Sequence, residues 1–442
     1  MLILVAGVAL GVALTLSPLT LLVLGASAAL LQRVTRTLPP DERWWLIRLC
    51  VLAIALRVAA IGVLFLVSNH DSQGAGYLFG DEAYALSRSW RFRNVLLGFP
   101  QLKYDYMIAF EGYGQSSYIS MMTYLQMLAG PAPYGLRVLN AVVYMSAVLV
   151  LFRMTRRAFG AFTAFSGTVV LLFLPTLFFW SISLLKESFY FVLTVAALAA
   201  VAEAVHATTW SRRALAAAVL LASLFGLQGL RNGAVALALT GIGAGLAAAY
   251  VVGQRTRVVL TSAAAVVAVI ACLVVPALQQ RLLAAVEQAA VTHTGHVFTV
   301  GHGYKLLDEN YYIEPGNPTT YDLTAAEASR YVIRAAVSYF TVPLPWQITT
   351  RGELAYLPEQ LLWYVMLALA PIGAFVAIQR DRIVAMLLIA SVLPTALVVA
   401  MTTGNVGTLI RHRTLVVPYL IWISAMGLPW MMRRLTGAKA AA

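Results

Sequence analysis

The sequence predicts an all-α fold, a polytopic bundle of transmembrane helices, on the strength of three observations. Hydrophobic residues make up 61% of the 442 positions and charged residues only 11%, whereas soluble domains carry about 25% charged residues. The mean hydropathy is +0.81. Apolar runs of about 20 residues, the length with which a helix crosses a bilayer, recur along the chain. This pattern excludes a soluble enzyme, a disordered scaffold and a soluble nucleic-acid binder.

We expect about eleven membrane-spanning segments within a single integral-membrane domain that covers residues 1–442. Their predicted ranges are 2–31, 46–68, 134–152, 160–180, 187–206, 213–230, 232–252, 258–276, 357–378, 383–401 and 414–431. The first segment lacks a basic start and an A-x-A-like cleavage site, so it is expected to remain as a span. Cys50 and Cys272 lie far apart in apolar segments, which indicates neither a disulfide nor a metal site.

The distribution of charge predicts the orientation of the chain. The short loops on one side carry 15 basic residues against three acidic ones, whereas the other side carries 14 of each. Since basic loops stay in the cytoplasm, the net charge of +13 is mostly a topology signal and not a nucleic-acid-binding surface. We therefore expect a protein of the plasma (inner) membrane whose two long loops, 69–133 and 277–356, are extracytoplasmic. Residues 118–129 and 329–342 in these loops are predicted to form amphipathic interfacial helices.

An acidic motif, GDEAY at residues 80–84, opens the first long loop. Adjacent carboxylates just above the membrane, Asp81 and Glu82, could accept a proton from a nucleophilic hydroxyl or hold a divalent cation. The same pair also suits a plain helix cap, with Asp81 as the N-cap of a helix over residues 82–90.

Four basic residues are predicted at the outer ends of spans, where they could hold a phosphate. Lys186, one of four lysines in the chain, sits at the start of a span, where a cation needs an anionic partner. Arg231 lies in a nearly loop-free LRNG turn, and Arg411 and Arg413 can fork onto a phosphate. Each also suits an ordinary interfacial anchor, in the case of Lys186 by snorkelling beside Glu187.

Other polar residues indicate chemistry less directly. Arg57 lies midway along a span and is expected to be paired within the bundle. His293, His296 and His302 include a His-x-x-His spacing, but the glutamate of an HExxH motif is missing, so a solvent-exposed loop is expected. No P-loop, Rossmann fingerprint, G-x-S-x-G elbow or CxxC motif occurs, which disfavours ATP-driven and nucleotide-cofactor chemistry.

Taken in order along the chain, these motifs resemble those of the GT-C superfamily of membrane glycosyltransferases, in particular the branch of protein O-mannosyltransferases and lipid A aminoarabinose transferases. The resemblance covers most of residues 45–430. It comprises the GDEAY motif, a Pro-containing span that ends in SLLKE, the LRNG turn, a second outer loop with Pro343, Pro345 and Trp346, and the final GTLIRHR segment. One departure is that the acidic motif follows the second predicted span instead of the first, which an extra N-terminal helix explains.

The resemblance implies a glycosyltransferase that uses a polyprenyl-phosphate-linked sugar on the extracytoplasmic face and transfers the sugar to a glycan, lipid or protein acceptor. It implies the acidic role at the acceptor for Asp81, with Glu82 as its neighbour. It also implies a cradle of cations for the donor phosphate: Lys186, Arg231, Arg411 and Arg413. As the acceptor hydroxyl attacks the anomeric carbon, negative charge develops on the leaving phosphate, and positioned cations would stabilise it. A single displacement of this kind inverts the anomeric centre.

Two other classes of protein stay open. A glycan polymerase or ligase with a polyprenyl-linked donor also has arginine-lined outer sites, although the GDEAY motif favours the monosaccharide transferase. A non-catalytic transporter of lipid-linked sugars would need charged residues along a path at mid-bilayer, which the spans lack apart from Arg57. No cofactor is required by these motifs, although the acidic pair is compatible with Mg²⁺ or Mn²⁺.

Overall fold

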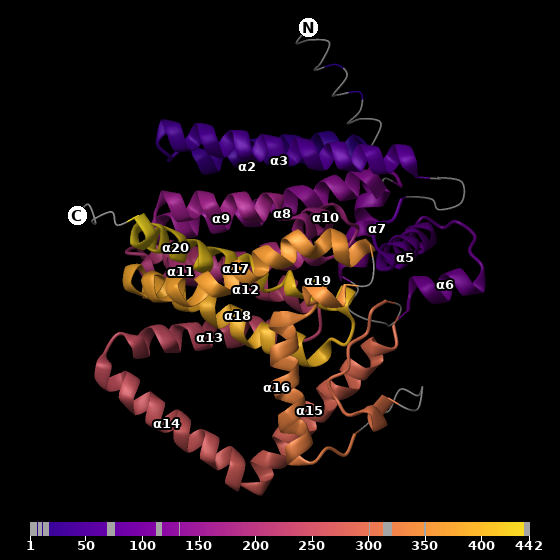
Figure 1. The fold of residues 1–442 in the computed structure, drawn as a ribbon. Coiled ribbons are helices and arrows are strands. Elements are labelled where there is room, and N and C mark those ends of the chain that lie inside the picture. The colour runs from indigo at the N-terminus through magenta and orange to yellow at the C-terminus, as the bar shows by residue number, and fades with distance from the viewer. Residues whose placement is uncertain are drawn as a thin grey trace. The chain divides into compact units, whose positions relative to one another are not determined.

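The computed structural model describes residues 7, 11, 17–68, 76–111, 117–131, 133–299, 301–312, 321–348 and 351–436. These residues form helices and short connections, with no strand among them, which confirms the predicted all-α polytopic bundle (Figure 1). Eight of the described helices are long and apolar enough to cross a membrane, or up to ten if each of two bent pairs forms one span. Nine of the eleven predicted spans coincide with these, and 258–276 falls on a helix that is not among them. The first predicted span, 2–31, lies partly outside the described residues, and its later part belongs to the helix Pro18–Thr35.

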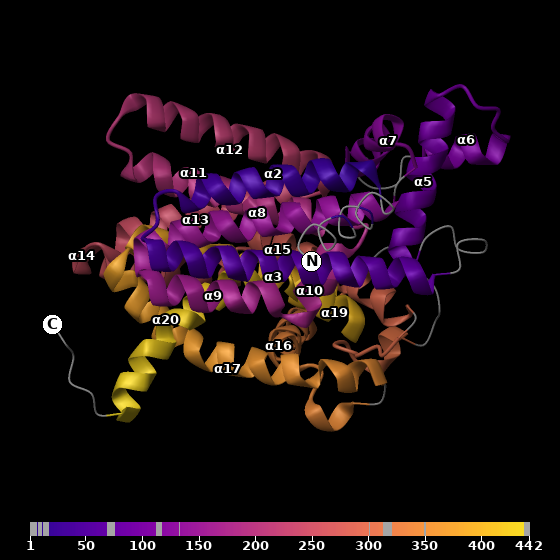
Figure 2. The ribbon, with the colours of Figure 1, turned by 90° about the horizontal axis from the view of Figure 1, so that it is seen from above.

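The chain divides into two compact units, Met1–Ala238 and Leu239–Ala442. The helices of the first unit are α2 (Pro18–Thr35), α3 (Pro40–Val67), α5 (Gly80–Leu96), α6 (Lys103–Ala109), α7 (Ser117–Ala129), α8 (Pro133–Phe159), α9 (Ala161–Phe173), α10 (Pro175–Ile182), α11 (Glu187–His206), α12 (Trp210–Leu230) and the start of α13 (Ala234–Val252). The most buried span is α8, which packs against α2, α3, α9, α10 and α11. Figure 2 shows α5, α6 and α7 gathered at one end of these long helices.

Ion pairs join the basic loops at the opposite end of the first unit. Arg156 near the end of α8 pairs with Glu42 in the first turn of α3. Glu203 near the end of α11 pairs with Arg157 at 3.2 Å and with Arg212 of α12 at 3.1 Å. Three of the loops that the charge pattern assigns to one side therefore meet at one end of the unit, and the acidic motif lies at the other end.

The bend between α9 and α10 is supported by Arg57, a fully buried residue of α3. The two helices meet at 61° just before Pro175. The guanidinium of Arg57 donates hydrogen bonds to the carbonyl oxygen of Leu172 at 3.0 Å and to the hydroxyl of Ser181 at 2.8 Å. It also lies 4.7 Å from the ring centre of Phe178. This pairing within the bundle agrees with the sequence-based expectation and stabilises the bent end of the span that leads into the SLLKE turn.

The second unit contains the rest of α13 and the elements α14 (Arg255–Val274), α15 (Pro276–Val297), η1 (Glu309–Tyr312), α16 (Ala325–Thr341), η2 (Pro345–Gln347), α17 (Arg351–Arg380), α18 (Arg382–Thr402), α19 (Val406–Arg413) and α20 (Val417–Thr436). Helices α17 and α20 approach closely because Gly373 has no side chain: a Cβ there would lie 1.8 Å from the carbonyl oxygen of Ile423. Helices form at both segments predicted to be amphipathic, α7 at 118–129 and α16 at 329–342. Four buried residues at helical spacing define the inner face of α16: Ala328, Tyr331, Ala335 and Tyr339.

Candidate functional site

Glu82, in the first turn of α5, is fully buried and its carboxylate is fully engaged. Oε1 accepts hydrogen bonds from the backbone N–H groups of Leu78 and Phe79 at 3.2 and 3.1 Å. Oε2 accepts one from the N–H of Leu184 at 3.1 Å and lies 2.7 Å from the guanidinium of Arg137, which is also fully buried. Burial raises the pKa of Glu82, and the charge of Arg137 with the backbone donors opposes that rise. Glu82 therefore acts as a positioning residue that ties the start of α5 to the α10–α11 turn.

Two polar residues of α8, one helical turn apart, donate hydrogen bonds to the turn between α10 and α11. Arg137 donates a hydrogen bond to the carbonyl oxygen of Ile182 at 3.0 Å. Asn140 donates one to the carbonyl oxygen of Leu185 at 3.0 Å. Since backbone carbonyls in a buried turn need donors, these two side chains fix the conformation of the residues just before Lys186. Lys186, which directly precedes α11, therefore follows a turn whose conformation is fixed.

The exposed carboxylate of Asp81 and the half-buried ammonium of Lys186 belong to the same local assembly. Asp81 is the immediate neighbour of Glu82, and Lys186 comes two residues after Leu184. The hydrogen bond that the Leu184 N–H donates to the Glu82 carboxylate therefore links the two segments that carry them. The ring of Phe79 also stacks on Trp180 near the end of α10, with centroids 3.7 Å apart. The first unit therefore brings together one predicted acid and one predicted cation.

Arg231 lies at the same end of the first unit, in the tight turn between α12 and α13. The turn is closed by Gly233, whose φ of +76° favours glycine. Arg231 is half-buried, and its charge acts electrostatically on Tyr190. Tyr190 itself donates its backbone N–H to the carbonyl oxygen of Lys186 at 2.9 Å. Arg231 and Lys186 therefore both interact with Tyr190, in the first turn of α11.

In the second unit the two predicted arginines of α19 differ sharply in environment. Arg411 is half-buried, whereas only 1% of Arg413 is exposed. Arg413 donates hydrogen bonds to the carbonyl oxygens of Tyr339 and Val342, the latter at 2.6 Å, and to Oε1 of Gln360 at 3.0 Å. Arg413 is therefore neither an exposed interfacial anchor nor accessible to a phosphate, because the end of helix α16 packs against it. Its guanidinium secures α16 to α19 and leaves Arg411 as the more accessible cation.

The expectation of a solvent-exposed histidine loop is also wrong for His293, which is fully buried in α15. Its Nδ1–H donates to the carbonyl oxygen of Thr403 at 2.6 Å, and its Nε2 accepts from the hydroxyl of Tyr312 at 3.1 Å. Burial lowers the pKa of His293 to about 4, so the ring is neutral at pH 7. His302 pairs with Glu353 at 2.8 Å. These contacts join α15 and the loop after it to the end of α18 and the start of α17.

Stability of the second unit should fall on acidification because of His293. Its pKa is lower in the folded protein, about 4, than its ordinary value of 6.5. Below pH 6.5 the His293 ring therefore binds a proton in the unfolded chain but not in the folded chain. The free energy of unfolding decreases as the pH falls toward 4. One pKa unit is worth about 1.4 kcal/mol, which gives a loss of about 3 kcal/mol over this range.

Denaturant unfolding in detergent at pH 7 and pH 4 measures this loss. His293→Asn should be less stable at pH 7 but should show a weaker pH dependence, while His206→Gln, at an exposed position, serves as the matched control. An equal pH dependence in wild type and His293→Asn would contradict the assignment.

Sequence reasoning missed the residues that build the support of the site. Arg137 and Asn140 fall within a predicted span. An arginine near the end of a span was the available signal that Glu82 has a buried partner. Within the described ranges, no group of three or more His, Cys, Asp or Glu side chains could hold a metal ion.

No protein-family model, curated protein or solved structure matches the chain. Fold and composition define its class as a polytopic helical membrane protein.

Proposed function

We propose that the protein is a glycosyltransferase that takes a sugar from a polyprenyl-phosphate carrier at the extracytoplasmic face of the plasma (inner) membrane. The observation that carries the proposal is the set of buried contacts around Glu82. These contacts join the segment with the exposed carboxylate of Asp81 to the segment with the half-buried ammonium of Lys186. A carboxylate can orient or deprotonate an acceptor hydroxyl, and a cation can stabilise a departing phosphate. The resemblance to GT-C enzymes supports the same roles for Asp81 and Lys186.

In this proposal the acceptor is a glycan, lipid or protein hydroxyl. Asp81 accepts or orients the hydroxyl proton as the oxygen attacks the anomeric carbon. The bond to the carrier phosphate breaks with the electron pair on the phosphate oxygen, and the polyprenyl phosphate leaves as an anion. Lys186 and Arg231, both in the first unit, hold this anion. Because their charges attract the leaving group more strongly as its negative charge grows, they lower the barrier as well as bind the donor.

Lys186→Ala should raise the KM for the polyprenyl-phosphate sugar by about tenfold to a hundredfold, since each factor of ten corresponds to about 1.4 kcal/mol of lost interaction. The measurement is transfer rate against donor concentration for the purified protein in lipid vesicles. Lys103→Ala, at an exposed lysine of α6, is the matched control and should behave as wild type. Unchanged kinetics in both Lys186→Ala and Arg231→Ala would remove the support for a phosphate-binding role.

A further inference from the structure

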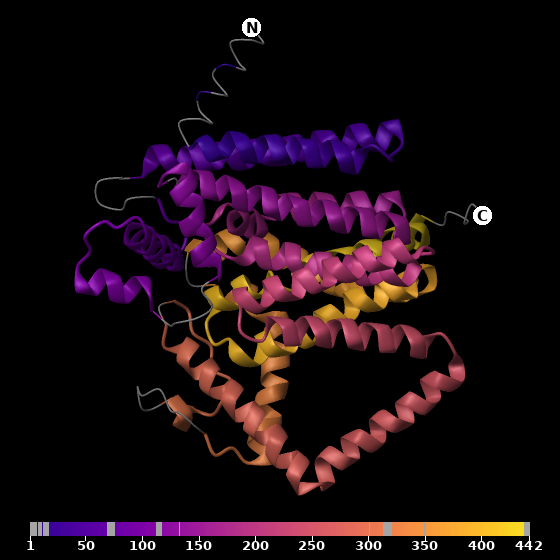
Figure 3. The same cartoon turned by 180° about the vertical axis from the view of Figure 1, so that it is seen from behind.

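A groove of about 610 Å³ lies between the starts of α3 and α9 in the first unit, and we call it the α3–α9 groove. Both helices belong to candidate membrane spans, α3 as one span and α9 with α10 as a bent pair. Figure 3 shows the connection between α2 and α3, which directly precedes the groove, at the end opposite α5 and α6. Phe162 and Val169 line the groove and are exposed on a span, so the groove is open to the bilayer.

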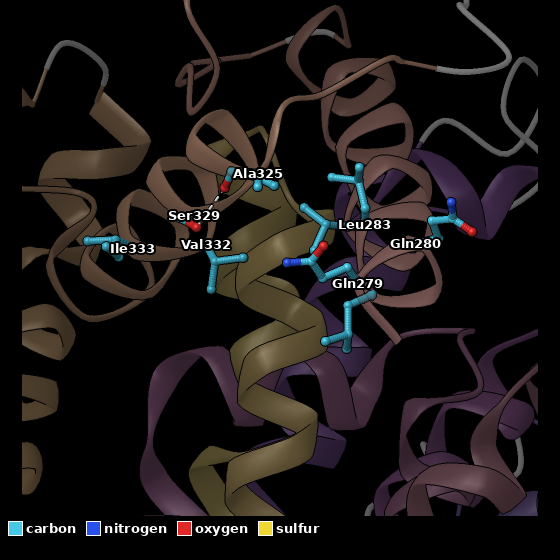
Figure 4. A pocket seen from close by; sticks show the side chains of 10 residues that line it. Gln279, Gln280, Leu283, Ala325, Ser329, Val332 and Ile333 are labelled. Atoms are coloured by element: carbon cyan, nitrogen blue, oxygen red, sulfur yellow. Dashed lines mark hydrogen bonds between the residues drawn. The ribbon is translucent and has the colours of Figure 1, made fainter. Parts of the chain in front are cut away.

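The α3–α9 groove is acidic at one end and mainly apolar along the rest. Asp41 and Glu42, in the first turn of α3, line the acidic end. Phe162, Phe165 and Val169 of α9 line the remainder, over about 12 Å of helix from the start of α9. By contrast, no charged residue lines the groove between α15 and α16 of the second unit (Figure 4). The α3–α9 groove therefore offers an amphiphilic molecule both a charged contact and an apolar surface.

The two carboxylates of the groove differ in their partners. Glu42 accepts a hydrogen bond from Nη2 of Arg156 in α8 at 2.9 Å and forms an ion pair with it. Asp41 is exposed, and within the described part of the chain no ion pair involves it. Since 27% of the Arg156 side chain is exposed, a cation also lies beside the carboxylates. The acidic end therefore presents charges of both signs, which matches a ligand that carries an ammonium next to a phosphate.

Two tryptophans indicate the depth of the acidic end in the membrane. Trp45 lines the groove and is 56% exposed, and its ring lies 4.8 Å from that of Trp44, measured between centroids. The guanidinium of Arg48 covers the Trp44 ring at 3.0 Å from its centroid. Exposed tryptophans and arginines of this kind are typical of the headgroup region of a bilayer. Asp41 therefore lies at the level of lipid headgroups, and the apolar part of the groove extends toward the acyl chains.

We propose that the α3–α9 groove binds a phospholipid whose headgroup carries a primary ammonium, of the phosphatidylethanolamine class. The ammonium donates hydrogen bonds to Asp41, the phosphate contacts Arg156, and an acyl chain lies along the apolar side chains of α9. A primary ammonium has three N–H donors, whereas the quaternary ammonium of phosphatidylcholine has none. Phosphatidylglycerol has no cation, and Asp41 repels its charge. This site is independent of the reaction proposed at the other end of the first unit.

The test uses the full-length protein in phosphatidylcholine nanodiscs with a trace of phosphatidylethanolamine that carries a photoreactive diazirine in one acyl chain. Mass spectrometry should find adducts on α9 and on the start of α3. Unlabelled phosphatidylethanolamine should compete these adducts away, whereas phosphatidylglycerol should not. A phosphatidylcholine with the same diazirine should label the groove about tenfold less, the ratio expected for the loss of one charge-assisted contact.

Two variants test the charged and the apolar part of the groove separately. Asp41→Asn keeps the size of the side chain but removes its charge, and it should lower the adduct yield about tenfold. Asp322→Asn, at an exposed aspartate of the second unit, is the matched control. Ser166→Trp fills the groove from α9 without a change of charge and should also lower the yield. Leu22→Trp, at a position of α2 that is 72% exposed, is the control for the added indole.

Four outcomes would overturn the inference. Equal labelling by the two photoreactive lipids would assign the groove to ordinary membrane lipid. Competition by phosphatidylglycerol would show that the basic loops, and not Asp41, attract the lipid. An unchanged adduct yield in Asp41→Asn would contradict recognition of the ammonium. Adducts confined to helices other than α3 and α9 would remove the groove as the binding site.

Discussion

Asp81→Asn should reduce sugar transfer by about 10²–10⁴-fold, the usual contribution of a positioned general base. The amide keeps the size of the side chain but cannot accept a proton at neutral pH. Asp81 is exposed, and the buried contacts at the start of α5 belong to its neighbour Glu82, so the fold and the KM for the donor should stay close to wild type. The measurement is kcat at saturating donor in reconstituted vesicles.

Asp322→Asn, at an exposed aspartate in the second unit, is the matched control for this variant. It should retain full activity, because it removes an equivalent charge at a residue that has no role in the proposed reaction. Full activity in Asp81→Asn would remove Asp81 from the mechanism. Loss of donor affinity with an unchanged kcat would instead assign the residue to donor binding.

Glu82→Gln should destabilise the protein by about 3–5 kcal/mol, the usual cost of leaving a buried charge without its partner. The guanidinium of Arg137 is fully buried and lies 2.7 Å from the Glu82 carboxylate, so the substitution leaves an uncompensated cation. The glutamine amide also cannot accept all the hydrogen bonds that the carboxylate accepts from Leu78, Phe79 and Leu184. Unfolding in detergent with increasing denaturant measures the change.

The double variant Glu82→Gln with Arg137→Gln separates the ion pair from other effects. If the pair is coupled, the double variant should lose less stability than the two single variants together, by about 0.5–3 kcal/mol. Strictly additive losses would show that the pair does not interact. A Glu82→Gln protein as stable as wild type but inactive would return Glu82 to a catalytic role.

The sequence predicted most of the bundle because hydropathy and charge act locally. Any segment of about 20 apolar residues must cover its backbone polar groups by forming a helix in the membrane, whatever its neighbours are. The helices α8, α11 and α18 could therefore be predicted from the sequence alone. The charge pattern did not predict the individual ion pairs of Glu42 and Glu203 with arginines of neighbouring loops, which the structure shows.

The site was harder to predict because its support comes from residues far apart in the chain. Asp81 and Glu82 are equivalent as sequence, and only the buried Arg137 makes one of them a structural residue. Arg411 and Arg413 are likewise equivalent until the end of α16 packs on the second of them. A buried partner cannot be predicted from a local pattern, because burial depends on which helices become neighbours.

Polyprenyl monophosphate is the leaving group of the proposed reaction, and identification of the lipid product tests this reaction most directly. The purified protein is incubated in vesicles with membrane lipid-linked sugars and an acceptor extract, and the lipid product is identified by mass spectrometry. The account predicts release of polyprenyl monophosphate by the wild-type protein and about 10²–10⁴-fold less release by Asp81→Asn. Release of polyprenyl diphosphate instead would favour a glycan polymerase or ligase. Movement of intact lipid-linked sugar across the membrane without any release would contradict an enzymatic function altogether.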